Sequence, residues 1–151
     1  MNAEMKITAV AENDLPDVLP LIAEYQRFYG ASDIDSARNH EFFAQFTGAN
    51  DRGVLHALRL EGATVGFSTI YFSFSSALAK PVAVLNDIFV ASEWRRRGYG
   101  RALIEHASVY ARNAGYARLQ WLTAQDSTSA QHLYDTFDAK KSAWYFYALS
   151  V

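Results

Sequence analysis

The sequence feature that most restricts the possible folds lies between residues 82 and 122, where the spacing of the apolar residues changes. Apolar residues dominate a strand-like run from Val82 to Val90, and a turn rich in glycine and arginine follows it. From Leu103 to Ala114, apolar residues then recur at every third or fourth position, as on one face of a helix. Gly115 is placed to end that helix, and residues 117–122 are predicted as a short strand. A strand, a helix and a second strand in this order predict a crossover unit on a sheet.

The remainder of the chain shows the same two periods, alternation for strands and three-to-four spacing for helices. Pro20 is expected to kink or delay the first helix, because proline lacks the amide proton that a helix interior needs. The predicted elements are a strand at Met5 to Val10, helices at Leu15 to Tyr25 and Asp35 to Phe46, strands at Gly53 to Leu60 and Thr64 to Phe74, the crossover unit, a helix at Asp126 to Phe137 and a strand at Ala143 to Leu149. This order predicts one mostly antiparallel sheet packed by helices, in a single domain of residues 1–151.

Composition and charge exclude several classes of function. Fourteen basic and sixteen acidic side chains leave no excess positive field, so we expect no nucleic-acid partner. The absence of cysteine excludes disulfides, thiolate metal clusters and a cysteine nucleophile, and favours the cytoplasm. No apolar run approaches the roughly 20 residues that span a bilayer, so we expect neither secretion nor a membrane partner. His40, His56, His106 and His132 lack the spacing of a zinc helix, so no metal site is expected.

The turn after Val90 is the segment with the clearest functional chemistry. Its residues are Arg95, Arg96, Arg97, Gly98, Tyr99, Gly100 and Arg101. Glycines let the main chain approach an anion, the first turn of a helix offers unpaired N–H groups, and arginines donate bidentate hydrogen bonds to phosphate. The turn therefore predicts a pyrophosphate site, although a solvated charged turn has the same composition. It has neither the third glycine of a dinucleotide fingerprint nor the Gly-Lys-Ser/Thr of a P-loop.

The pattern Arg95-x-x-Gly98-x-Gly100 resembles the Gln/Arg-x-x-Gly-x-Gly/Ala pattern of the GCN5-related N-acetyltransferase (GNAT) superfamily. Residues 85–90 are similar to that family's fourth strand, and Ala130-x-x-Leu133-Tyr134 is similar to its fourth helix. The resemblance spans about residues 5 to 149 and is greatest to the group that contains the diamine acetyltransferases. It implies an α/β (α+β) GNAT fold, with a single mixed, mostly antiparallel sheet of six to seven strands flanked by about four helices.

The resemblance also implies roles for individual residues. The strand backbone would pair with the pantetheine arm of acetyl-coenzyme A (acetyl-CoA), and the amides of the turn would hold its pyrophosphate. Tyr134 would protonate the leaving thiolate, with plain helix core as the alternative. Ser127 stands where the family usually has an asparagine that touches the pantetheine. The residues expected to bind the cofactor are Ile88, Phe89, Val90, Arg95, Arg96, Arg97, Gly98, Tyr99, Gly100, Arg101 and Ser127.

A general base is harder to identify. Diamine acetyltransferases have a glutamate where this chain has Asn86, and an amide cannot accept a proton at working pH. Asp87 is the neighbouring candidate, and strand alternation places it on the opposite face from Asn86. It is predicted either to act through water or to bind a cationic acceptor. Glu24, Tyr25 and Tyr29 are expected to line the acceptor site together with Asp87.

The expected function is transfer of acetyl from acetyl-CoA to a primary amine of a small molecule, such as a polyamine or an amino acid, by direct attack on the thioester. Two alternatives stay open: a catalytically silent CoA-binding regulatory module, and a protein or peptide N-acetyltransferase. The aromatic run from Trp144 to Tyr147 is predicted as strand core or as a dimer face, and a homodimer is the expected assembly.

Overall fold

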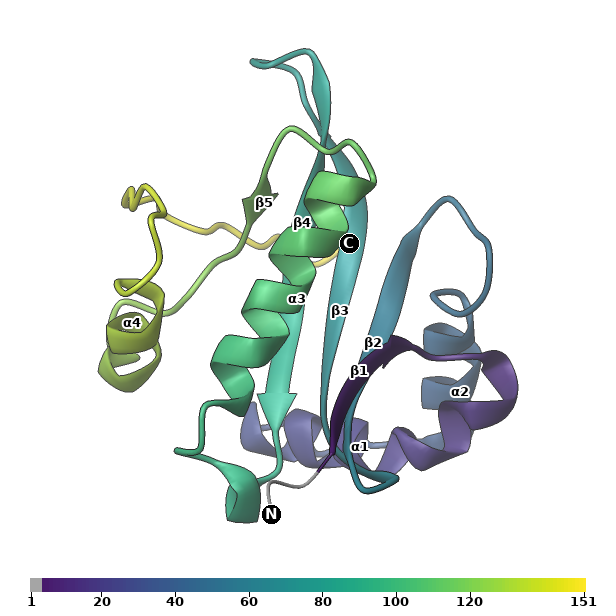
Figure 1. Ribbon diagram of the computed structural model, residues 1–151. Helices are drawn as coiled ribbons and strands as arrows, with labels where there is room; N and C mark the ends of the chain where they lie inside the picture. Colours follow the sequence, from purple (N-terminus) through teal and green to yellow (C-terminus); the bar gives the residue numbers. More distant parts are fainter. Residues whose placement is uncertain (1–3) are drawn as a thin grey trace. The chain divides into compact units, whose positions relative to one another are not determined.

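The computed structural model describes residues 4–151, which form two compact units that divide after Trp121 (Figure 1). The first unit contains β1 (Met5–Ala9), a 3-10 helix (Glu12–Asp17), α1 (Leu19–Phe28), α2 (Ser36–Ala44), β2 (Gly53–Leu60), β3 (Ala63–Ser75), β4 (Lys80–Val90), a 3-10 helix (Ser92–Trp94), α3 (Tyr99–Asn113) and β5 (Leu119–Gln120). The second unit contains α4 (Thr128–Tyr134). Four α-helices among the described residues confirm the predicted number.

The sheet has the order β1-β2-β3-β4-β5. The first four strands pair antiparallel, and β5 runs parallel to β4. A parallel neighbour requires a crossover connection, and α3 supplies it between β4 and β5. The predicted mixed, mostly antiparallel sheet and its crossover unit are therefore confirmed.

The predicted number of strands, six to seven, is wrong, because the sheet formed by residues 4–151 has five. The missing strand is the predicted one at residues 143–149, which is in neither a helix nor a strand. Its side chains are exposed, from 79% for Trp144 to 89% for Tyr147, so the run is not strand core. Aromatic composition favours extended backbone, but a strand forms only where a neighbour completes its hydrogen-bond ladder.

The start of α1 follows from its prolines. Pro16 lies in the 3-10 helix, and the α-helix begins only at Leu19, with Pro20 in its first turn. Proline is tolerated there because the first N–H groups of a helix have no intrahelical acceptor. The predicted delay of this helix is confirmed.

The sheet carries a separate apolar core on each face. Leu15 and Ile22 pack with Phe67 and Phe89 in one core. The other core joins Leu103 of α3 to sheet residues that include Leu58 and Val90. Successive residues of a strand point to opposite faces. The end of β4 therefore directs Phe89 toward α1 and Val90 toward α3.

Polar side chains interrupt the packing of α3 against the sheet. His56 of β2 is 2% exposed, and its ring lies 4.6 Å from that of His106 and 5.1 Å from that of Tyr110, both on α3. Its direct cross-strand neighbour is Ser68. Burial, with a smaller effect of His106, lowers the pKa of His56 to about 4. The imidazole is therefore neutral in the folded protein at neutral pH.

This burial predicts a loss of stability in acid. An unfolded His56 takes up a proton near pH 6.5, whereas the folded one does so only near pH 4, so the free energy of unfolding should fall as pH drops through that window. The shift corresponds to about 3 kcal/mol at most. Denaturant unfolding from pH 7 to pH 4 should show a shallower decline in His56→Gln than in the parent protein. Equal slopes would contradict a neutral, buried His56.

Candidate cofactor and acceptor site

The centre of the candidate site is an irregularity in β4. Thr69 of β3 pairs with Asp87, but the next residue, Ile70, pairs with Leu85, which leaves Asn86 as an extra residue in β4. Such bulges re-aim side chains and occur beside active sites. Asn86 is exposed and Asp87 is 6% exposed. The bulge interrupts the simple alternation on which their predicted opposite faces depend, and the two side chains are hydrogen-bonded to each other.

The carboxylate of Asp87 accepts hydrogen bonds from three side chains. The Tyr25 hydroxyl donates to Oδ1 at 2.5 Å, and Asn86 Nδ2 donates to the same oxygen at 3.2 Å. The Thr69 hydroxyl donates to Oδ2. A carboxylate has about four lone-pair sites, so one acceptor position remains for a further donor. Asp87 is thus a buried carboxylate held by three donors, with one acceptor position left.

Two tyrosines beside Asp87 have raised pKa values. Burial raises the pKa of Tyr25 well above its ordinary value, and the hydrogen bond to Asp87 and its charge add to the shift. Burial, followed by the charge of Asp87, raises the pKa of Tyr71 to about 12. Both phenols therefore keep their protons at neutral pH, and Tyr25 acts as a donor.

Beyond the bulge, one edge of β4 has no strand beside it in the described part of the chain. The short β5 pairs only with Ala83 and Val84. The backbone of Ile88, Phe89 and Val90 borders this edge. An unpaired edge can receive an extended ligand as an added strand, which suits the predicted pairing of these three residues with a pantetheine arm.

The turn between β4 and α3 presents main-chain donors. Arg96 and Gly98 have positive φ values of 60° and 87°, and Gly98 is the N-cap residue of α3. Glycine supplies no capping oxygen, in contrast to Asp35, which accepts from the amide of Arg38 at the start of α2. The first N–H groups of α3 therefore have no helical acceptor and no capping side chain. Their partial positive charge favours an anion such as a pyrophosphate.

The arginine side chains of this turn mostly have protein partners. Arg95 Nε donates to the carbonyl of Val90 at 2.9 Å. The guanidinium of Arg97 lies over the ring of Trp94, and Arg101 pairs with Glu105. The main chain of the turn is thus the more available source of donors to an anion.

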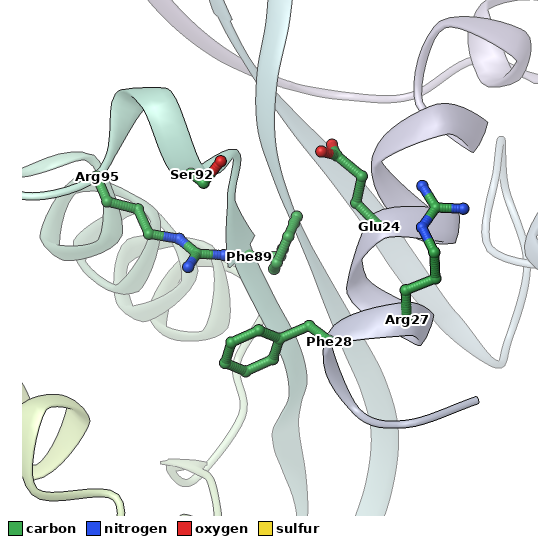
Figure 2. Close-up of a pocket in the computed structure, with 6 residues that line it drawn as sticks. All are labelled: Glu24, Arg27, Phe28, Phe89, Ser92 and Arg95. Carbon is green, nitrogen blue, oxygen red and sulfur yellow. The ribbon is translucent and has the colours of Figure 1, made fainter. Parts of the chain in front are cut away.

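A pocket of about 370 Å³ lies on the α1 side of β4 (Figure 2). Its lining residues are Glu24, Arg27, Phe28, Phe89, Ser92 and Arg95. The Phe89 ring also contacts Tyr25, with ring centroids 5.9 Å apart, and Tyr25 in turn holds Asp87. Of the predicted acceptor residues, the structure brings Glu24 to the pocket and Tyr25 to Asp87. Tyr29 is exposed and packs against Tyr25.

Two predicted site residues belong to the second unit. Ser127 is the N-cap residue of α4, and its hydroxyl makes no capping hydrogen bond. Tyr134 is the last residue of the same helix and is half-buried. Their roles stay predictions.

Sequence reasoning missed Thr69, Arg27, Phe28 and Ser92. Thr69 reaches Asp87 only through the register of β3 against β4, which includes the bulge. Arg27 and Phe28 lie between the predicted residues Glu24 and Tyr29. Their position at the exposed end of α1, next to the predicted acceptor residues, could have indicated that they line the same site.

Among residues 4–151, no group of three or more histidine, aspartate or glutamate side chains lies close enough to hold a metal ion. None of the helices in this range is long and apolar enough to cross a membrane.

The end of β4 thus has an unpaired edge, and a glycine turn and the uncapped start of α3 follow it, an arrangement that suits an extended ligand carrying an anionic group. The model of the Acetyltransferase (GNAT) family matches residues 18–138. The chain belongs to this family of N-acetyltransferases, whose acyl donor is acetyl-CoA.

Individual relatives agree with this assignment. An uncharacterized N-acetyltransferase of Bacillus subtilis, YhfO, is 32% identical over 132 residues, which cover 87% of each chain. A thialysine N-epsilon-acetyltransferase of Caenorhabditis elegans is 26% identical over 88 residues, covering 56% of this chain and 54% of that one. The crystal structure of a probable acetyltransferase superimposes with a TM-score of 0.85 at 28% identity, covering 97% of each chain.

Proposed function

We propose that this acetyltransferase acts on the primary amine of a small molecule, by direct attack of the amine on the thioester of acetyl-CoA. The observation that carries the proposal is the arrangement along the end of β4. The buried carboxylate of Asp87, with one open acceptor position, lies next to the unpaired strand edge and only a few residues before the turn at the uncapped start of α3. A cationic amine and an anionic cofactor would thus meet along one strand.

The chemistry of the amine assigns a role to Asp87. A primary ammonium has a pKa near 10.4 and no lone pair, so it must lose a proton before it attacks. We propose that Asp87 attracts this ammonium and takes its proton through a water at the open acceptor position. Tyr25 and Thr69 hold the carboxylate in place.

The cofactor supplies an acetyl group activated as a thioester. Amides from Arg96 to Arg101 would hold its pyrophosphate, and the edge of β4 at Ile88 to Val90 would pair with its pantetheine arm. A free N–H of that edge would donate to the oxyanion. Tyr134 would return a proton to the leaving thiolate, with Ser127 as a further contact.

Two similarities support the proposed class of acceptor. The resemblance to diamine acetyltransferases and the partial similarity to a thialysine acetyltransferase favour a small amine, either a polyamine or an amino acid. We further propose that the chain acts as a single domain in a cytoplasmic homodimer, with the exposed aromatic run from Trp144 to Tyr147 as a candidate contact face.

One observation favours a second function. Asn86 stands where the diamine acetyltransferases have glutamate, and this loss fits a module that binds CoA without turnover. Such a module would also keep the uncapped turn before α3.

Release of free thiol separates these functions. The protein should liberate CoA from acetyl-CoA when polyamines or amino acids are added, and release should saturate with the amine. Peptides with free N-termini or lysines provide the comparison for protein acetylation. Binding of CoA without thiol release from any of these acceptors would favour the silent module, and release with peptides alone would exclude a small-molecule acceptor.

A further inference from the structure

The pocket beside Phe89 contains charges that the protein leaves unpaired. Among the described residues, Glu24, Arg27 and Arg95 take part in no ion pair, although all three line the pocket. Arg101 on the neighbouring helix, in contrast, has a carboxylate partner at 3.1 Å. Opposite charges that line one cavity without pairing are available to a ligand that carries both signs.

Arg95 is held in place before any ligand arrives. Its Nε donates to the Val90 carbonyl, and its guanidinium lies 5.3 Å from the ring centroid of Phe28 and 5.1 Å from that of Phe89. These contacts leave its two terminal nitrogens, which form the planar fork that binds a carboxylate in a bidentate way. The side chain therefore presents a preorganised carboxylate site, whereas the cofactor contacts proposed for the turn come mainly from its main chain.

Glu24 provides the complementary charge. Figure 2 shows Arg95 reaching in from the loop after β4, while Glu24 and Arg27 come from α1 on the other side of Phe89. A carboxylate in this position suits an ammonium group of the ligand. A volume of about 370 Å³ is at the small end of the range for ligand pockets and suits a small molecule.

The pocket and the proposed reaction centre lie on the same face of β4. Phe89 is two residues from Asp87 on the same strand, so both side chains point to the α1 face. Tyr25 touches the Phe89 ring and also donates to Asp87. An acceptor seated against Phe89 can therefore extend a second amine toward Asp87.

We infer that the acceptor is a diamino acid: its carboxylate binds the arginines of the pocket, its α-ammonium faces Glu24, and its side-chain amine is acetylated beside Asp87. This inference rests on the proposed function and makes the acceptor class specific. A plain diamine fits less well, because one of its cationic ends would face two guanidinium groups with a single carboxylate to balance them.

Matched acceptors test the inference directly. Lysine should exceed 1,5-diaminopentane, and ornithine should exceed 1,4-diaminobutane, by at least about tenfold in kcat/KM, because each pair differs only by the carboxylate. Arg27→Gln should reduce this preference through the KM of the amino acid and leave the KM of acetyl-CoA unchanged. Arg112→Gln is the matched control, since Arg112 is also an exposed arginine in the last turn of a helix but does not line the pocket.

Two results would overturn the inference: diamines used as well as or better than the amino acids, or a rise in the KM of acetyl-CoA in Arg27→Gln. Calorimetry with lysine and 1,5-diaminopentane in the presence of CoA separates this inference from the proposed function. Tighter binding of lysine without thiol release would support the pocket assignment and refute catalysis. Equal or weaker binding of lysine would refute the pocket assignment, whether or not acetyl transfer occurs.

Discussion

Replacement of Tyr134 by phenylalanine is expected to lower kcat for acetyl transfer by about 10²-fold or more, the usual contribution of a general acid. The leaving thiolate of CoA has a free-thiol pKa of about 8.5, and a tyrosine hydroxyl, with a pKa near 10, can protonate it only where the site assists the transfer. Phenylalanine keeps the ring of Tyr134 and removes its hydroxyl group, which is the proton donor. The loss should therefore appear in kcat, measured as thiol release at saturating acetyl-CoA and amine.

Tyr147→Phe is the control for this experiment, because Tyr147 is 89% exposed and lies outside any helix or strand. It should retain the activity of the parent protein. Full activity in Tyr134→Phe would refute the role of Tyr134 as general acid. An increase in the KM of acetyl-CoA at unchanged kcat would instead assign its hydroxyl to cofactor binding.

Replacement of Gly98 by valine is expected to raise the dissociation constant of CoA by roughly 10²-fold, or about 2.7 kcal/mol. Gly98 has a φ of 87°, a conformation that β-branched residues avoid. No neighbouring atom lies within 4 Å of a Cβ added there, so the effect arises from the backbone and not from a clash. A valine that relaxes to negative φ would turn the amides of the turn away from the anion.

Gly115 provides a matched control at the other end of α3. It has a φ of 84° and the same open surroundings for an added Cβ. Gly115→Val should therefore lower the melting temperature to a similar degree but leave the affinity for CoA unchanged. Equal losses of affinity in both variants would mean that the substitutions weaken CoA binding only by destabilising α3. Unchanged affinity in Gly98→Val would refute the anion site at this turn.

Sequence patterns predicted the strands well where burial of the side chains determines the spacing of apolar residues. The bounds of β2, β3 and β4 agree with the predicted strands to within two residues, because their apolar residues face cores on both sides of the sheet. The segment at residues 143–149 has the same apolar character, but strand formation depends on a partner that composition does not reveal.

The candidate site was less predictable, because its contacts join distant parts of the chain. The position of Asp87 followed from the family resemblance, but its bond from Thr69 depends on where a bulge shifts the register. The direction of the Arg95 side chain depends on the ring of Phe28, which α1 brings to the end of β4. Neither contact leaves a periodic signal in the sequence.

The alternation of β4 separates two tasks within four residues. Main-chain atoms from Ile88 to Val90 are proposed to serve the acyl donor, and the side chains of Asp87 and Phe89, on the α1 face, are proposed to serve the acceptor. Main-chain groups are kept in most substitutions. Side chains on the α1 face can therefore change without lowering the affinity for the acyl donor. New acceptor preferences can therefore evolve here one substitution at a time. At each step the enzyme would still bind its acyl donor.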